Sequence, residues 1–333
     1  MTRNKLDGPL VSVLTPFHNT ASYLGESIES VLDQSYDNFD YILVDNQSDD
    51  GSTEIAEKYA RADERIRLLR TDRLLSQGEN YSFALSNIDP DAKYCKIVQA
   101  DDWIYPQCLT EMVALGQANP SVGLISSYRI EGESVVGDGL PVDRSILNGD
   151  ETARLHLLKG PIFLFGTQTT VMYRADLVRA RTPFYRHDRY HFDTDVAYEL
   201  LALSDFGFVH QVLSYTRVDP QSTFGRETPF NPRELDFLLI VLRHGRRFLG
   251  AADYHNVVGE AWRRYYRSFA SALVRNAMHG RTKEFWRYHR AGLRTVGASI
   301  EPVRVLGGVG RTAADALGNP MQTITAWRRW RTA

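Results

Sequence analysis

Residues 11–53 have the sequence VSVLTPFHNTASYLGESIESVLDQSYDNFDYILVDNQSDDGST. A short apolar run at 10–15 predicts a strand, and apolar residues at helical spacing over 23–34 predict a helix. A second apolar run at 41–45 predicts the next strand. This stretch therefore has the strand–helix–strand order from which parallel sheets are built.

The same alternation continues along the chain. Helices are expected over 52–62 and 79–88, and strands over 66–70 and 94–98. Strands that alternate with helices predict an α/β fold with a doubly wound, mostly parallel sheet. In such sheets ligands bind beyond the carboxyl ends of the strands.

Polar and aromatic residues follow three of these strands at their carboxyl ends. They are Thr15, Pro16 and Phe17 after the first strand, Asp45 and Asn46 after the second, and Asp101 and Asp102 after the fourth. Because parallel strands end at one edge of the sheet, we expect the three clusters to converge on one site.

The sequence VQADDWIYP, residues 98–106, places two adjacent carboxylates directly after an apolar strand. Two such charges repel by roughly 4 kcal/mol at an effective dielectric constant of 20, so they favour a bound cation or a proton. The chain has no G-x-x-x-x-G-K-[ST] loop for phosphates, and Mg²⁺ or Mn²⁺ can instead bridge carboxylates to substrate phosphates. Alternatively, Asp101 and Asp102 cap a helix that begins near Pro106.

Length and composition fit one large soluble domain with an appendage. The chain has 333 residues, of which 43% are apolar and 24% charged. We expect a catalytic domain over 1–231 and a basic helical region over 232–333. Two cysteines are too few for a disulfide framework, and the first residues lack the pattern of a secretory signal, so a cytoplasmic location is expected.

Charge is unevenly distributed along the chain. Residues 243–333 contain 17 Lys and Arg against 5 Asp and Glu, a net charge of +12, and the remaining residues contain 22 against 36, a net −14. Basic residues alternate with aromatic ones in the expected helices 259–278 and 283–296 and at 324–333. This pattern predicts contact with an anionic membrane surface, which would make the protein peripheral on the inner face of a membrane. The alternative is a helical hairpin with a solvated basic face, and the acidic front argues against nucleic acid.

In order and spacing, VSVLTPF…YILVDNQSDDGST and VQADDWIYP resemble the inverting family 2 glycosyltransferases of GT-A fold, over residues 9–220. The resemblance implies a nucleoside-diphosphate sugar as donor, with a UDP- or dTDP-sugar favoured, and Mn²⁺ or Mg²⁺ as cofactor. It implies that Thr15, Pro16 and Phe17 line the nucleotide base, that Asp45 and Asn46 lie beside it, that Asp101 faces ribose or metal, and that Asp102 is a metal ligand. Asn80 and Arg73 fall where the family has a loop near the diphosphate.

The chain departs from the family pattern at several positions. Asn46 stands where the family often has a second Asp, which leaves the base less certain, and Gln99 replaces the first acid of the metal motif. Arg217-Val218-Asp219 stands where the family often carries Arg-x-His, so that His contact is missing.

The resemblance also implies a general base at the start of a helix near residue 195. The family has Glu-Asp there, and this chain has Thr194-Asp195, which makes Asp195 the expected base and Asp193 its alternative. Thr194 or Asp195 also fits a simple helix cap. Gly166 and Thr167 are expected under the donor sugar or acceptor.

The sequence thus predicts a metal-dependent inverting transferase that moves a sugar to a hydroxyl group of a glycan or lipid-linked acceptor, in cell-surface polysaccharide synthesis. A catalytically silent nucleotide- or glycan-binding subunit stays open, because Asn46, Gln99 and Thr194 depart from the pattern. A nucleotidyltransferase of similar fold is the other alternative, although the loop after the first strand lacks glycine and Lys or Arg.

Overall fold

The computed structural model describes residues 8–137, 140–159, 165–186, 191–218 and 230–308. Contacts divide the chain into two compact units. The first comprises residues 1–188 and 192–218, and the second comprises 189–191 and 219–333. The contacts do not test the boundary between a catalytic domain and a basic helical region that the sequence predicts at residues 231 and 232, so that boundary stays a prediction.

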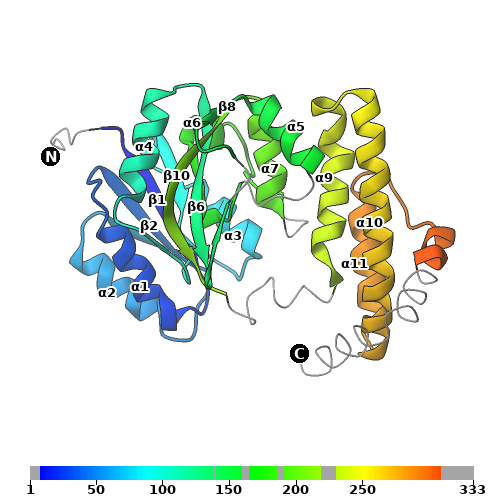
Figure 1. Ribbon diagram of the computed structural model, residues 1–333. Helices are drawn as coiled ribbons and strands as arrows, with labels where there is room; N and C mark the ends of the chain where they lie inside the picture. The colour runs from blue at the N-terminus through cyan, green and yellow to red at the C-terminus, as the bar shows by residue number, and fades with distance from the viewer. Residues whose placement is uncertain (1–7, 138–139, 160–164, 187–190, 219–229, 309–333) are drawn as a thin grey trace. The chain divides into compact units, whose positions relative to one another are not determined.

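The first unit is built on one mixed sheet with helices packed around it (Figure 1). The strand order of this sheet is β3-β2-β1-β4-β9-β6-β10-β5. Its strands are β1 (Val11–Phe17), β2 (Phe39–Asp45), β3 (Ile66–Arg70), β4 (Tyr94–Ile97), β5 (Trp103–Ile104), β6 (Val122–Glu131), β9 (Met172–Arg174) and β10 (Asp205–Thr216). Two short strands, β7 (Ser134–Val136) and β8 (Ile146–Leu147), pair with β6 and β10.

The half of the sheet that the sequence predicts is parallel. Strands β3, β2, β1 and β4 run side by side in the same direction, which confirms the doubly wound, mostly parallel expectation. The other half is mixed, because β9 lies antiparallel between β4 and β6, and β5 pairs antiparallel with the end of β10.

Helices cover both faces of this sheet. The first-unit helices are α1 (Ala21–Leu32), α2 (Ser52–Ala62), α3 (Gln77–Leu85), α4 (Cys108–Ala118), α5 (Gly149–Lys159), the 3₁₀ helix η1 (Gln168–Thr170), α6 (Ala175–Arg179) and α7 (Phe192–Leu201). Helices α1, α2 and α4 share one hydrophobic cluster with the strands. Helix α3 contacts β1 and β2 and contributes nothing to that cluster, so it covers the opposite face.

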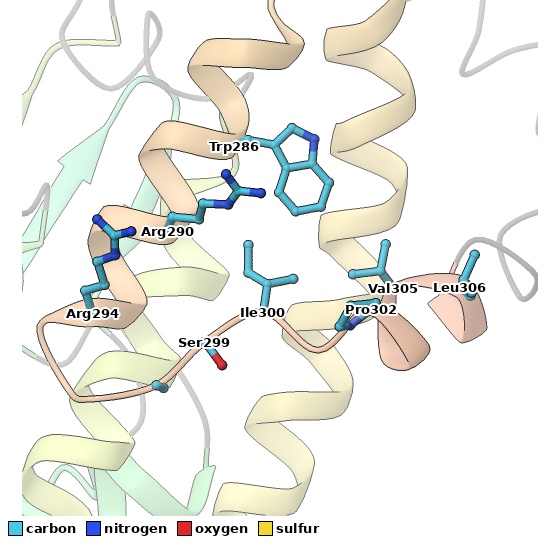
Figure 2. Close-up of a pocket in the computed structure, with 9 residues that line it drawn as sticks. Trp286, Arg290, Arg294, Ser299, Ile300, Pro302, Val305 and Leu306 are labelled. Atoms are coloured by element: carbon cyan, nitrogen blue, oxygen red, sulfur yellow. The ribbon is translucent and has the colours of Figure 1, made fainter.

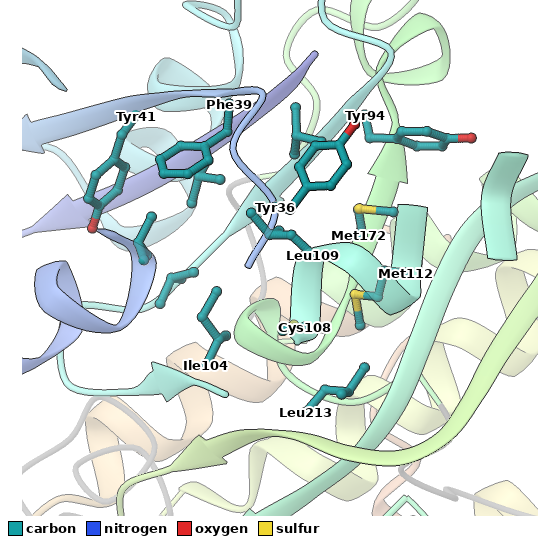
Figure 3. Close-up of a cluster of buried hydrophobic side chains, with 14 of the residues drawn as sticks. Tyr36, Phe39, Tyr41, Tyr94, Ile104, Cys108, Leu109, Met112, Met172 and Leu213 are labelled. Atoms are coloured by element: carbon teal, nitrogen blue, oxygen red, sulfur yellow. The ribbon is translucent and has the colours of Figure 1, made fainter. Parts of the chain in front are cut away.

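In this cluster, alternate residues of the strands pack against the apolar faces of the helices. In β1, Val11, Val13 and Phe17 point to the face that receives Leu24 and Ile28 of α1. Figure 3 shows the same cluster at α4, where Cys108, Leu109 and Met112 lie among Tyr94, Met172 and Leu213. Strands β1, β2 and β4 are buried along their whole length, as is typical of parallel sheets. The edge strand β3 is only partly buried.

The described part of the second unit is helical. Helices α9 (Pro232–Phe248), α10 (Ala251–Met278) and α11 (Thr282–Arg294) contact one another. Between α10 and α11 the contact is made by the buried rings of Tyr265, Phe269, Phe285 and His289. The helices expected over 259–278 and 283–296 correspond to α10 and α11. The basic segment 324–333 lies outside the described residues.

Across the described residues, no helix is both long enough and apolar enough to cross a membrane.

Candidate active site

The ends of β1, β2 and β4 meet at one edge of the sheet. Phe17 pairs in register with Asp45, and the Phe17 carbonyl accepts a hydrogen bond of 2.8 Å from the Asn46 N–H. On the other side of β1, the Val98 N–H donates to the Leu14 carbonyl at 2.9 Å. The structure therefore brings together the three clusters that the sequence places at strand ends.

The residues at the end of β1 are buried. Thr15, Pro16 and Phe17 are all closed to solvent, and the Thr15 hydroxyl lies 2.8 Å from the Tyr41 hydroxyl. The loop that follows is tied to its neighbour, because His18 Nδ1 lies 2.9 Å from the Asn46 carbonyl oxygen. The role of these residues at a nucleotide base stays a prediction.

The Asp45 carboxylate organises the loop after β2. It accepts hydrogen bonds of 2.8 Å from the Ser48 N–H and from the Thr53 hydroxyl, and it lies 3.5 Å from Nε of Arg70. Because it is fully buried, its lone pairs serve the fold of this loop. The loop after β2 therefore depends on Asp45 for its conformation, whatever else the loop binds.

Asn46 joins the loop after β2 to the loop before α3. Its Oδ1 accepts from the Leu75 N–H at 2.8 Å, and its Nδ2 donates to the Leu75 carbonyl at 3.0 Å. An Asp at this position could not donate the second bond. The departure from the family pattern thus has a structural reason in this chain.

The Asp102 carboxylate is the more deeply buried acid of the pair. It is 2% exposed, and it accepts hydrogen bonds from the Thr169 hydroxyl at 2.6 Å, the Arg217 N–H at 3.0 Å and the Thr216 hydroxyl at 3.5 Å. These donors come from η1 and from the end of β10, so one carboxylate joins β4 to two distant segments.

Burial, and after it the negative charge of Asp101, raises the pKa of Asp102 to about 7. None of the donors described for Asp102 is a side-chain cation. Three donors leave part of its four lone-pair directions available. A divalent cation would offset the repulsion that raises the pKa, so the pair fits a hard metal ion.

The capping alternative for the acidic pair is wrong. Helix α4 begins at Cys108, and its N-cap residue is Gln107, so neither Asp101 nor Asp102 caps it. Asp101 is half-buried and is therefore the more accessible carboxylate of the pair. Its charge also raises the pKa of Tyr81 on α3, after the larger effect of burial.

Arg217 is a site residue that the sequence did not reveal as such. Its Nε donates to the Asp101 carbonyl at 3.1 Å, and its guanidinium bonds to Glu26 at 2.8 Å and lies 4.3 Å from the centroid of the Tyr23 ring. The Arg-x-His comparison drew attention to this position, but only for the missing His. Asp219, the third residue of that motif, lies outside the described residues.

A buried lysine is linked to the acidic pair through Thr169. Lys96 of β4 is fully buried and donates to the carbonyl oxygens of Thr169, at 2.5 Å, and Val171, at 3.3 Å. The Thr169 hydroxyl then accepts from the Gln99 N–H at 3.0 Å and donates to Asp102. The sequence shows Lys96 only as an interruption of an apolar strand.

Two buried polar atoms in this region have no hydrogen-bond partner among the described residues. They are Oδ1 of Asn80, on α3, and Nε2 of Gln168, whose Oε1 accepts from the Tyr185 hydroxyl at 2.6 Å. Unsatisfied buried groups are costly, so both are candidates for ligand contacts. Arg73 instead is exposed and pairs with Glu79 at 3.0 Å.

The candidate bases lie in the first turn of α7, which begins at Phe192. Because the helix starts earlier, neither Thr194 nor Asp195 is its cap. Asp193 accepts from the Thr194 N–H at 2.7 Å, and Asp195 is buried and pairs with Nε of Arg186 at 3.4 Å. Burial and, to a lesser extent, nearby groups that include the charge of Asp193 raise the pKa of Tyr185, whose hydroxyl donates to Gln168.

Gly166 and Thr167 lie beside η1, next to the residues that hold Asp102. Gly166 has a φ of 72°, and a side chain there would meet Thr170. The Thr167 hydroxyl lies 3.2 Å from that of Thr170. Their contact with sugar or acceptor stays a prediction.

The sequence is similar to those of known glycosyltransferases. The sequence model of the family described as Glycosyl transferase family 2 matches residues 12–181, just over half of the chain. Glycosyltransferase GlyG of Streptococcus pneumoniae is 31% identical over 36% of this chain and 39% of its own length. An uncharacterized glycosyltransferase of Haemophilus influenzae is 26% identical over 63% of this chain and 80% of its own length.

A third relative, the putative teichuronic acid biosynthesis glycosyltransferase TuaG of Bacillus subtilis, is 28% identical over 41% of this chain and 52% of its own length. The match thus spans about half or less of GlyG and TuaG.

Solved structures share the fold. S. aureus TarS 1-349 in complex with UDP-GlcNAc superposes with a TM-score of 0.60 at 16% identity, covering 86% of this chain and 82% of TarS 1-349. The mannosyltransferase PcManGT of Pyrobaculum calidifontis, in complex with GDP-Man and Mn²⁺, gives a TM-score of 0.56 at 16% identity, covering 98% and 88%. At such identity the likeness shows the GT-A-like fold alone.

The raised pKa of Asp102 predicts a pH-dependent stability. Between its ordinary pKa of 3.8 and about 7, the folded chain holds a proton that the unfolded chain has lost. The stability from this group is therefore complete below the ordinary pKa and is lost as pH rises through about 7. In Asp102→Asn, which stays neutral, the fall in unfolding free energy between about pH 5 and about pH 8 should shrink by a few kcal/mol.

Chemical denaturation in the presence of a chelator measures this difference. Asp91→Asn, a change at an exposed acid, is the control and should keep the wild-type pH dependence. An unchanged pH dependence in Asp102→Asn would show that Asp102 is ionised without cost.

Proposed function

The chain belongs to glycosyl transferase family 2, and on that premise we propose that it transfers a sugar from a nucleoside-diphosphate donor to a hydroxyl group of an acceptor. The observation that carries the proposal is the acidic pair Asp101-Asp102 at the carboxyl end of β4, with a buried Asp102 whose pKa is raised. Membership of the family confirms the resemblance expected from the sequence.

The proposed donor is a UDP- or dTDP-sugar. TarS has been solved with UDP-GlcNAc and PcManGT with GDP-Man, which supports a nucleoside-diphosphate sugar for this chain as well. Thr15, Pro16 and Phe17 would line the base with Asp45 and Asn46 beside it, Asp101 would face the ribose or the metal, and Asn80 would offer its unpaired Oδ1.

Asp101 and Asp102 are the residues that would hold Mn²⁺ or Mg²⁺. When bound, such a cation offsets the negative charge that develops on the leaving diphosphate. Thr169, Thr216 and the Arg217 N–H fix the Asp102 carboxylate for this role, because they leave it little rotational freedom.

Inversion requires a base for the acceptor hydroxyl. The acceptor oxygen forms a bond to the anomeric carbon from the face opposite the leaving group, the bond from that carbon to the diphosphate oxygen breaks, and the hydroxyl proton passes to a carboxylate. Asp195 is the proposed base and Asp193 its alternative. Arg186 near Asp195 would favour the ionised carboxylate that accepts the proton.

A glycan or a lipid-linked saccharide made on the cytoplasmic side of a membrane is the proposed acceptor, in the synthesis of a cell-surface polysaccharide. The name of TuaG, a relative by sequence, supports this class of product.

Removal of the acidic pair should abolish metal-dependent donor binding. In Asp102→Ala, UDP with Mn²⁺ should no longer raise the melting temperature, whereas for wild type a ligand at a hundred times its Kd adds about 2.7 kcal/mol. Asp101→Ala, at the more accessible acid, is the second variant in case Asp102→Ala folds poorly. A panel of UDP, dTDP and GDP with and without Mn²⁺ measures the effect.

The control for this panel is Asp91→Ala, which should respond like wild type. Persistent Mn²⁺-dependent binding in both pair variants would place the metal elsewhere and contradict the proposal.

Loss of the base should separate binding from turnover. Asp195→Asn should bind the donor normally and lower turnover by a hundredfold or more, within the roughly 10²–10⁴ range of general-base catalysis. Initial rates with a sugar-nucleotide panel and membrane-extracted acceptors give the measurement. Full activity in Asp195→Asn with loss in Asp193→Asn would assign the base to Asp193, and binding without any turnover in wild type would favour the silent subunit.

A further inference from the structure

Helix α11 carries a row of basic side chains on its exposed side. The row consists of Lys283, Arg287, Arg290 and Arg294, at intervals of 4, 3 and 4 residues. This spacing places all four on one face of the helix, and all four are exposed. The opposite face is buried in the unit through Phe285, His289 and Leu293. We call these four residues the basic row.

The basic row differs from other arginines of the second unit in its ion pairing. Among the described residues, none of its members forms an ion pair with Asp or Glu. Other arginines of the same unit do, at distances of 2.7 to 2.9 Å: Arg263 with Glu260, Arg264 with Glu234 and Arg304 with Glu301. The row therefore presents four positive charges to whatever meets this face.

A cavity of about 490 Å³ opens beside the basic row (Figure 2). Trp286, Arg290 and Arg294 line it from successive turns of α11. The chain segment that follows α11 supplies the opposite wall, with Ile300, Pro302 and Val305. One wall thus carries two guanidinium groups and an indole, and the other is apolar.

Large apolar side chains remain in water at the same place. Val303 is 80% exposed, and Leu306, which also lines the cavity, is 71% exposed. The Arg290 guanidinium lies 5.3 Å from the centroid of the Trp286 ring, so the two side chains lie side by side on this wall. Exposed apolar groups beside unpaired cations are typical of surfaces that meet lipid.

We propose that the basic row and the adjoining cavity bind an anionic phospholipid of a membrane surface. Arg290 and Arg294 receive the lipid phosphate, and the apolar wall with Leu306 receives the start of the hydrocarbon part. Trp286 lines the same wall as the two arginines, and indole side chains are common at membrane interfaces. A free phosphate would have no use for the apolar wall. This inference concerns the second unit alone and does not depend on the chemistry proposed for the acidic pair.

Vesicle co-sedimentation of the full chain tests the proposal. The protein should pellet with vesicles of phosphatidylcholine mixed with phosphatidylglycerol, much less with phosphatidylcholine alone, and less at high salt. Arg290→Gln with Arg294→Gln should lower the partition coefficient by more than tenfold, because each basic side chain near anionic lipid contributes about fivefold.

Two matched controls separate the site from general charge and general hydrophobicity. Arg263→Gln with Arg267→Gln removes the same net charge from α10 and should cost much less. Val303→Asn with Leu306→Asn should weaken binding several-fold at constant charge, whereas Val135→Asn, at a 63% exposed position of the first unit, should leave it unchanged.

Several results would overturn the proposal. One is a fall in vesicle binding that is equal in the α10 and α11 charge variants, and another is unchanged binding in Val303→Asn with Leu306→Asn. Binding that does not depend on lipid charge, that inorganic phosphate inhibits as well as anionic vesicles do, or that is matched by pelleting without vesicles would contradict it equally. Asp101→Ala should retain vesicle binding, so a failure of the donor site and a failure of the lipid site give different results.

Discussion

The carboxyl-terminal edge of the parallel strands depends on the burial of one carboxylate, Asp102, beside the charge of Asp101. Burial alone would favour a protonated acid, and the raised pKa expresses that cost. The chain offsets part of it with donors from η1 and from the end of β10. Segments far apart in sequence are thereby held against the end of β4. A cation at the pair would remove the rest of the cost. Under the proposed function, the feature that fixes the fold at this edge would therefore also serve to bind a metal and a diphosphate.

The acids and amides of the edge fall into two groups according to their hydrogen bonds. Asp45 and Asn46 form hydrogen bonds with residues of the neighbouring loops, and so they fix the conformation of those loops. Asn80 and Gln168 each keep a buried polar atom without a partner among the described residues. Those atoms, with the pair on β4, are the groups whose bonding a ligand would complete.

Much of the fold followed from the sequence, because buried strands and amphipathic helices have direct periodic signals. The convergence of Thr15, Asp45 and Asp102 followed in turn from the geometry of parallel sheets. The antiparallel strand β9 and the role of Arg217 did not, because strand pairing and hydrogen bonds between residues far apart in sequence leave no local pattern. The alternation of basic and aromatic residues predicted contact with an anionic membrane surface. The cavity beside the basic row became visible only in the structure, because residues after α11 form its second wall.

The most direct test of the central claim is crystallographic. Crystals grown with UDP and Mn²⁺ should show one peak in the manganese anomalous difference map, coordinated by Asp101 or Asp102 and by diphosphate oxygens. This result would assign the acidic pair to donor binding. Ordered UDP at the sheet edge with no manganese at the pair, or manganese bound elsewhere in the chain, would contradict the account.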